Sequence, residues 1–470
     1  MDLHEGVSER LVQRLTDVLA AGSLMSRKYL SFETMKAVDA LNQILDRNVL
    51  AKLKSYTSDN PLMDVTSIVL EQTLVHTEYN EVAVERLIDV LGTAAPLDIA
   101  VQVVALIESL PWHYVYALPL PDSLDAAFPA HGFWKLGEDA KIAKGVGLTE
   151  KFEVATSPSS FMNALSGQRS FFTNPGPTSA HLLIDAYGTI DQYSSTYPQL
   201  QAFEDMKSII GLMMALGLLR YRSTWKRNHP LVEVHINREA ADATYSFVQS
   251  TSLAGSTSEA LSMLRFNEPH GERIEDNWAG LVGSHLVSIQ RVLADEANRK
   301  RLLLAAKWYF DSFTGDSELL RFVQAMVSLE ILLGEENKEA YNNIGVGELM
   351  RNRVAYLIGQ DMNERAEILG TFNKLYDVRS RIVHRGHSHL SQEERRHLAT
   401  LRGYCARVIQ AEVKMLVSGD ALTDPNWPEA ILPTPKGVAL SPLLEALAGF
   451  DPNALDTEIP LISEAETGRG

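Results

Sequence analysis

The first hundred residues carry apolar side chains at the spacing of α-helices. The clearest stripe consists of Leu11, Leu15, Val18 and Leu19, and similar stripes lie at residues 38–45 and 84–91. Apolar residues three and four positions apart share one face of a helix, which packs against a core. We therefore predict an N-terminal helical region over residues 1–110.

The pattern changes over residues 111–240, where short apolar runs end near proline, glycine or asparagine. Such runs are typical of strands. The predicted elements are strands at residues 112–121, 181–190 and 231–237 and a helix at 202–219. We expect a mixed α/β region, which is a candidate sensor. Its aromatic and basic cluster at residues 221–229 suits base stacking and phosphate contact, or it is a helix end that leads into a strand.

Helical spacing returns over residues 241–418, and residues 419–470 form a tail rich in proline and acidic residues. Such a composition disfavours a packed core, so we expect partial disorder there. The longest apolar run, residues 209–219, is shorter than the ~20 residues that span a bilayer, which favours a buried helix. The predicted fold class is mainly α, with an N-terminal helical region, a mixed α/β middle region and a C-terminal helical bundle.

The net charge of the chain is −17, which repels nucleic acid at long range. One basic island opposes this background, because residues 374–402 contain seven Lys or Arg and three Asp or Glu. Any contact with RNA or DNA is therefore expected in that island. The alternative is a pair of solvated helices with an ordinary scatter of charges.

The chain has one cysteine, Cys405, so it forms no internal disulfide. This fits a reducing compartment, and the acidic N-terminus has no apolar stretch typical of a signal peptide. We expect a cytoplasmic protein in which Cys405 is a small buried residue and not a nucleophile.

A segment near residue 380 combines residue types that suit cleavage of a phosphodiester. Arg379 and His384 are five residues apart, an R-x4-H spacing, and Ser380 directly follows the arginine. A histidine transfers protons near neutral pH, and an arginine braces a phosphate through a planar fork. Ser380 can orient either by a hydrogen bond. The alternative is a solvated helix face, on which an arginine and a nearby histidine are common.

The geometry of a helix limits how these side chains meet. Ser380 and His384 would share a face, and so would Arg381 and Arg385, which are candidates for substrate contact. Arg379 and His384 would lie about 140° apart. A long arginine covers part of that angle, and a kink or a second copy of the helix from a partner chain would cover the rest.

Four segments surround the motif: Ala305–Phe313, Arg321–Gly334, Glu348–Gly359 and Lys374–Gly386. In order and spacing they resemble the Apea-like HEPN family of bacterial helical domains. The resemblance covers the last third of the chain before its tail, with a core of about residues 295–418. It implies a helical bundle that pairs with a second copy of itself, so that two R-x4-H segments form one composite site for metal-independent cleavage of RNA.

The resemblance also implies roles for individual residues. His384 would act as general base or acid on the ribose 2′-hydroxyl and the leaving oxygen. Arg379 would stabilise the negative charge that grows on the phosphate, Ser380 would orient the pair, and Tyr376 would line the cleft. No cofactor is expected.

Two other sets of residues were weighed. Glu330 lies in an apolar helix and needs a partner, for which Arg353 is the obvious candidate, as a structural ion pair. His384, His387 and His389 lie close together, but no further metal ligand is nearby, so we expect no metal site.

These patterns favour a metal-independent endoribonuclease of the HEPN type, in phage defence (abortive infection) or a toxin-like system. RNA would be the substrate, the C-terminal bundle would form a homodimer, and a phage or host trigger would act on the N-terminal region. The alternatives are a non-catalytic HEPN module that dimerises or binds RNA, and a helical scaffold that binds protein through residues 1–110.

Overall fold

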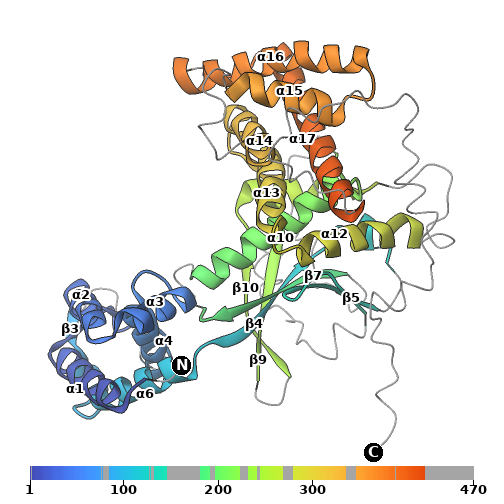
Figure 1. Cartoon of the computed structure of the whole chain (residues 1–470). Helices are drawn as coiled ribbons and strands as arrows, with labels where there is room; N and C mark the ends of the chain where they lie inside the picture. Colours follow the sequence, from blue (N-terminus) through green and yellow to red (C-terminus); the bar gives the residue numbers. More distant parts are fainter. Residues whose placement is uncertain are drawn as a thin grey trace, which may run out of the picture. The chain divides into compact units, whose positions relative to one another are not determined.

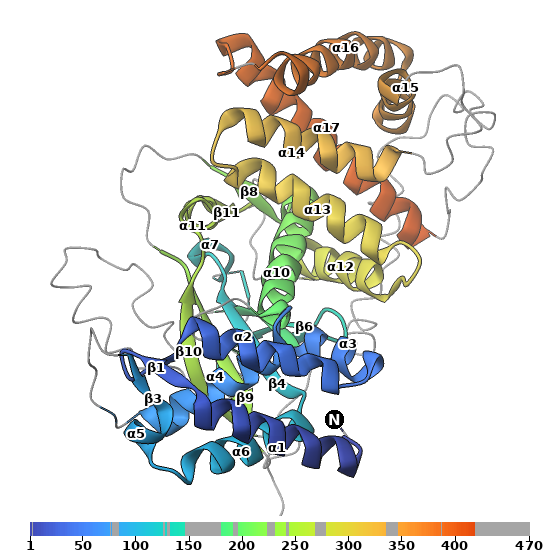
Figure 2. The same ribbon diagram turned by 90° about the vertical axis from the view of Figure 1, so that its left-hand side faces the viewer.

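The structure is a computed structural model, shown in Figures 1 and 2. It describes residues 1, 3–75, 77, 84–125, 127–128, 132–145, 180–190, 196–222, 231–240, 244–267, 279–334, 346–386 and 388–418. The fold is mainly α with a mixed α/β region, as predicted. Its contacts divide the chain into two units, the first made of residues 1–115, 185–203 and 238–243, and the second of the remaining residues.

Helices dominate the first unit. They are α1 (Glu5–Ala21), α2 (Phe32–Ala40), the 3-10 helix η1 (Leu41–Ile44), α3 (Arg47–Tyr56), α4 (Pro61–Leu74), α5 (Leu87–Leu91) and α6 (Ala95–Ser109). The predicted stripe on α1 is buried through Leu11, Leu15 and Leu19. Ser31 and Asp46 begin α2 and α3 as side-chain N-caps. The apolar faces of α1, α4 and α6 form one core.

The helix predicted at residues 84–91 is only half correct. Val84–Arg86 form a short strand, β3, and the helix α5 follows it. β3 pairs antiparallel with β1 (Ser23–Met25), which also pairs with β2 (Tyr29–Leu30). Pairing with a strand sixty residues earlier in the chain overrides the local helical spacing, which a reading of nearest neighbours does not detect.

The mixed α/β region supplies five strands of a six-stranded sheet in the order β10-β9-β4-β7-β6-β5. The sixth strand, β10, lies in the region 241–418, which was predicted to be helical, so that prediction is wrong at this point. The strands are β4 (Trp112–Pro119), β5 (Gly132–Lys135), β6 (Ala140–Lys144), β7 (His181–Gly188), β9 (Glu233–Glu239) and β10 (Tyr245–Ser252). The strands β4, β7 and β9 confirm the three predicted ones. The predicted region 111–240 is shared between the two units.

A long helix and a small two-stranded ribbon accompany the sheet. The helix α10 (Tyr197–Ala215) confirms the predicted helix, and its apolar residues 209–215 are buried. The ribbon pairs β8 (Leu219–Tyr221) with β11 (Leu264–Phe266), which follows α11 (Gly255–Ser262). A further short helix, α7, spans Asp122–Asp125.

The last described part of the chain is a helical bundle. It contains α12 (Ser284–Ala294), α13 (Arg299–Thr314), α14 (Glu318–Leu333), α15 (Val346–Ile358), α16 (Met362–Arg385) and α17 (Gln392–Ser418), after a π-helical turn at Ala279–Gly283. The α13–α14 hairpin and α17 enclose Phe310, Phe322 and Leu401, which are fully buried. The long helix α17 packs on each of α12 to α16 (Figure 2). Cys405 lies on α17 with no exposed surface, which confirms the prediction of a buried residue.

Among the described residues, no helix combines the length and the apolar character that crossing a bilayer requires. The predicted tail, residues 419–470, lies outside the described residues.

Candidate functional site

The R-x4-H motif lies in the last two turns of α16, a helix whose two ends are well defined. Asp361 begins it as an N-cap, because its carboxylate accepts a hydrogen bond from the backbone N–H of Glu364. Gly386 ends it in the left-handed conformation, with φ 63°. Glycine adopts this conformation without strain, so the helix ends at the residue after Arg385. The helix is uninterrupted between these ends.

This continuity settles one of the geometric alternatives. Because α16 has no break between Arg379 and His384, a kink does not bring the two side chains together. They project about 140° apart around the helix axis. Arg379 is half-buried toward α14, whereas His384 is exposed in the final turn. Within one copy of the chain, the motif therefore presents its histidine to solvent and its arginine to the bundle.

Arg379 is held by a carboxylate of the neighbouring helix. Its guanidinium lies 3.6 Å from the Glu330 carboxylate on α14, with both side chains roughly three-quarters buried. Burial raises the pKa of Glu330, and the charge of Arg379 opposes that shift. The buried glutamate thus has a cationic partner, as physical reasoning required.

The partner differs from the one predicted. The ion pair of Glu330 is with Arg379, while the guanidinium of Arg353 donates a hydrogen bond to the carbonyl of Leu333 at 2.6 Å. Arg353 thereby satisfies a carbonyl at the C-terminal end of α14. The choice between the two arginines depends on how α15 and α16 cross α14, which the sequence does not specify.

The remaining predicted site residues lie in different surroundings. Tyr376 packs its ring over Gly347 of α15, where an added Cβ would come within 2.8 Å of the ring. Arg381 pairs with Glu394 of α17 at 2.8 Å. The carboxylate of Glu394 also accepts a hydrogen bond from the backbone N–H of Ser391, and the hydroxyl of Ser391 accepts one from the backbone N–H of Glu394. The two residues thus form a capping box at the start of α17. The side chain of Arg385 lies outside the described part.

A groove of about 590 Å³ lies between α16 and α17, and Ser380 is one of its lining residues. Its ionisable lining consists of Lys374, Arg381, Asp377, Glu393, Glu394 and His397. Neither Arg379 nor His384 lines it. The acidic groups outnumber Lys374 and Arg381, so the groove does not attract a phosphate by its charge.

The basic island is weaker in the structure than in the sequence. Its ion pairs join Arg379 to Glu330, Arg381 to Glu394 and Arg395 to Glu318. Arg402 is turned inward and donates to the carbonyl of Ser312. Lys374 and Arg396 stay exposed on the surface. Acidic residues from outside the counted segment thus offset much of its charge, which counting along the chain could not reveal.

Other reactive groups in the bundle do not form a site. The Sγ of Cys405 donates to the carbonyl of Ala325, and burial raises the pKa of its thiol to about 12, so the thiolate is scarce at neutral pH. His389 lies beside the hydroxyl of Ser388 at 2.9 Å, and His387 lies outside the described residues. No group of three or more His, Cys, Asp or Glu within the described ranges could hold a metal ion.

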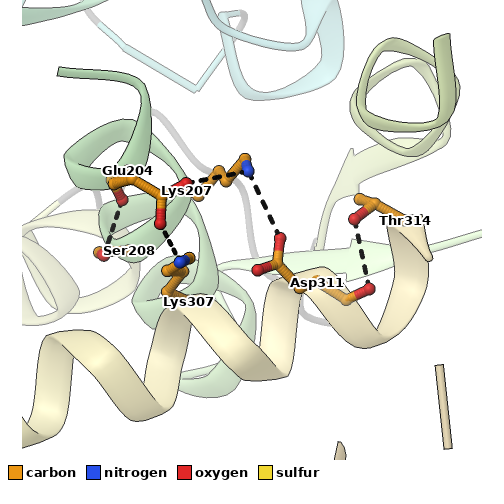
Figure 3. Close-up of polar contacts among 6 residues, drawn as sticks. All are labelled: Glu204, Lys207, Ser208, Lys307, Asp311 and Thr314. Atoms are coloured by element: carbon orange, nitrogen blue, oxygen red, sulfur yellow. Dashed lines mark hydrogen bonds and ion pairs between the residues drawn. The ribbon is translucent and has the colours of Figure 1, made fainter. Parts of the chain in front are cut away.

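Sequence reasoning missed a charge network between α10 and α13, drawn in Figure 3. Lys207 lies 3.2 Å from Glu204 and 3.7 Å from Asp311, and Lys307 contacts Glu204 on its other side. Burial alone would raise the pKa of Glu204, but the two lysines lower it below its ordinary value. Burial raises the pKa of Asp311, against the charge of Lys207. The i, i+3 and i, i+4 spacings on each helix were visible, but the pairing of the helices was not.

A second missed cluster lies on the sheet residues of the first unit. The imidazole of His113 on β4 contacts Glu239 on β9 at 2.6 Å and Asp185 on β7 at 3.2 Å. The ring of Tyr187 stacks on it, with centroids 4.8 Å apart. The hydrogen bond to Asp185 raises the pKa of His113 most, burial opposes it, and Glu239 adds to the rise. The imidazole of His113 therefore joins three adjacent strands.

Known proteins give no independent guide to these sites. No family model matches the chain, and neither a curated protein nor a solved structure matches it. Residues 223–230 of the predicted aromatic and basic cluster lie outside the described part, which leaves only Tyr221 and Arg222 of it in view.

Proposed function

We propose that this protein is a metal-independent endoribonuclease of the Apea-like HEPN type, acting on RNA in the cytoplasm. The observation that carries the proposal is the placement of the R-x4-H motif at the end of α16 in a helical bundle. There Glu330 fixes Arg379 from the neighbouring helix, and His384 is exposed. An exposed imidazole suits proton transfer to and from a phosphodiester, and a positioned guanidinium suits stabilisation of its charge.

The chemistry assigned to the motif needs no other reactant. His384 removes the proton of a ribose 2′-hydroxyl, whose oxygen attacks the adjacent phosphorus. The bond from phosphorus to the 5′-oxygen breaks, and that oxygen takes a proton from an imidazolium. The products are a 2′,3′-cyclic phosphate and a free 5′-hydroxyl. Arg379 stabilises the additional negative charge on the phosphate.

The geometry of α16 supports the proposal that a second copy of the chain takes part in the site. Arg379 and His384 point about 140° apart, so one helix cannot surround a phosphate. Two facing copies related by a two-fold axis would supply His384 from each chain. Val383, which is 48% exposed beside His384, gives that face an apolar contact. The first unit and the sheet would restrain the site until a phage or host trigger binds.

The test is cleavage of total cellular RNA in EDTA by the wild type, Arg379→Ala, His384→Ala and the matched control His389→Ala. We expect the first two variants to lose at least about a hundredfold in rate, the usual share of a general acid or base, and the control to keep its rate. Light scattering on the full chain should give a dimer. Equal cutting by all four proteins would refute the assignment.

A non-catalytic RNA-binding or dimerisation module is the second candidate. The observation in its favour is that Arg379 and Arg381 already hold carboxylates, which leaves fewer cations for a substrate. Under this alternative no protein cuts RNA with any trigger supplied, yet the full chain still dimerises. The two outcomes are distinct in the same experiment.

A further inference from the structure

Two arginines meet at the turn between α13 and α14. Arg321 of α14 donates to the carbonyl of Gly315 at 2.6 Å, and Arg402 of α17 donates to the carbonyl of Ser312. Both carbonyls belong to the C-terminal end of α13, which carries roughly half a negative charge. Two full positive charges therefore face about half a charge of opposite sign. The partial negative charge at the end of α13 therefore does not neutralise the two guanidinium groups.

At the next helical hairpin, two arginines again donate to carbonyls at the end of a helix, but a carboxylate neutralises one of them. At the end of α15, Arg365 donates to the carbonyl of Gly359, and Arg407 of α17 donates to that of Ile358. There the carboxylate of Glu364 accepts from Arg407 at 2.6 Å. Within the described residues, neither Arg321 nor Arg402 has such a carboxylate. Both turns therefore hold two arginines, but only the turn after α15 has a described carboxylate that pairs with one of them.

Arg402 stays charged in this setting. Burial and the nearby charge of Arg321 lower its pKa to about 10, which still leaves it protonated at neutral pH. Its guanidinium lies 4.0 Å from the centre of the Phe313 ring, and the ring of Tyr221 lies 4.9 Å from Phe313. The arginine pair is thus set among partly exposed aromatic rings, the combination that binds single-stranded nucleic acid.

A second unbalanced pair lies on the adjoining ribbon. Arg220 of β8 is directly opposite Arg265 of β11 in the register of the two strands, a position in which like charges destabilise a sheet. Arg265 donates to the carbonyls of Ser262 and Leu264, and Arg220 is exposed. Among the described side chains, neither arginine has an acidic partner. Figure 2 shows β8 and β11 beside the α13–α14 hairpin, where Tyr221 contacts Phe313.

We propose that Arg220, Arg265 and Arg321 form a binding surface for the phosphodiester backbone of single-stranded RNA, to which the more deeply buried Arg402 adds its charge. The protein as a whole carries −17, yet none of these four arginines has a carboxylate partner among the described residues. An RNA backbone supplies successive negative charges to such a surface. The inference rests on the proposed function for the fate of the strand, since this surface would hold the RNA that the R-x4-H motif cuts.

The experiment measures affinity for a short fluorescent oligouridylate by anisotropy, in EDTA, with His384→Ala as the parent so that cleavage does not interfere. The variant is Arg220→Gln/Arg265→Gln, which changes one exposed and one half-buried ribbon side chain, neither of which caps α13. The control is Lys135→Gln/Arg299→Gln, which removes the same charge from a groove of about 560 Å³ beside α12. We expect the first variant to lose about ten- to thirtyfold in affinity, since each lost phosphate contact changes the salt slope by roughly 0.7. The control should lose less than about threefold.

The outcomes separate the inference from the proposed function. Equal affinity in the ribbon variant and the parent overturns the surface, even if the wild type cuts RNA. Loss in the ribbon variant supports it, even if the wild type cuts nothing. Equal losses of affinity in the ribbon variant and the control would show that only the overall charge of the protein matters, which overturns the proposed position of the surface. Inorganic pyrophosphate that binds as tightly as the strand would reduce the surface to a small-anion site, which also overturns it. A deoxyuridylate strand bound as tightly as RNA supports backbone recognition without the 2′-hydroxyl.

Discussion

Gly211→Ala offers a sharp test of how α10 is joined to the bundle. Gly211 lies where α10 crosses α13, and a Cβ there would come 2.0 Å from the carbonyl oxygen of Ala306 and 2.6 Å from its carbonyl carbon. Both atoms belong to the backbone of α13, so no side chain can turn away to make room. The two helices would have to separate, and the contacts of Lys207 with Asp311 and of Lys307 with Glu204 would open with them (Figure 3).

The expected cost follows from two opposed terms. Alanine is the better helix former by about 1 kcal/mol. Forcing packed elements apart costs about 3 kcal/mol, at the upper end of ordinary overpacking. The net loss in the free energy of unfolding is therefore about 2 kcal/mol. For a chain of this size, that corresponds to a fall of roughly 2 °C in Tm.

Thermal unfolding followed by circular dichroism would measure this effect. The matched control is Gly370→Ala in the interior of α16, where an added Cβ meets no atom within 4 Å. The control should gain up to about 1 kcal/mol from helix propensity alone. The two variants should then differ by about 3 kcal/mol in opposite directions. A Gly211→Ala protein as stable as the control would refute the close approach of α10 to α13.

Three further predictions concern charge. Because the carboxylates raise the pKa of His113, its contribution to stability is full below its unfolded pKa of about 6.5 and is lost as the pH rises through the folded value. The urea midpoints of His113→Gln and the wild type should thus differ most in mild acid and converge in alkali; a constant gap would contradict the coupling. Arg379→Ala should destabilise more than Glu330→Gln, because only the former leaves a half-buried carboxylate without its cation; the reverse order in urea unfolding would be inconsistent with the pair. The third prediction concerns the triple variant His384→Ala/Arg220→Gln/Arg265→Gln. The slope of its log affinity for oligouridylate against log salt should lie between about −1.5 and −4, the range for two to six phosphates. Adding Arg381→Ala should change it by about half a unit or less, since Glu394 already neutralises that arginine, and a slope still steeper than about −6 would require a large basic surface elsewhere.

Local features were predictable because their causes lie close together in the sequence. The end of α16 follows from Gly386, and the burial of Cys405 follows from its apolar helix. The strands β4, β7 and β9 follow from their apolar runs. These need only the preferences of neighbouring residues.

Partner choice was not predictable, because it depends on how elements cross. Glu330 had two arginines within plausible reach, and only the packing of α16 on α14 selects Arg379. The opposition of Arg220 and Arg265 depends on the register of two strands forty residues apart. The cancellation of the basic island depends on Glu318 and Glu330, which lie outside it in sequence. Whether Arg379, Ser380 and His384 act in catalysis stays a prediction that the cleavage experiment decides.

The packing of α17 on each of α12 to α16 has a consequence for synthesis of the protein. This helix is translated last among the described elements, after α16 with its R-x4-H motif. A nascent chain on the ribosome therefore lacks the surface that Phe322, Phe310 and the other helices need until residues 392–418 have emerged from the exit tunnel. The bundle that carries the R-x4-H motif is therefore completed only late in synthesis.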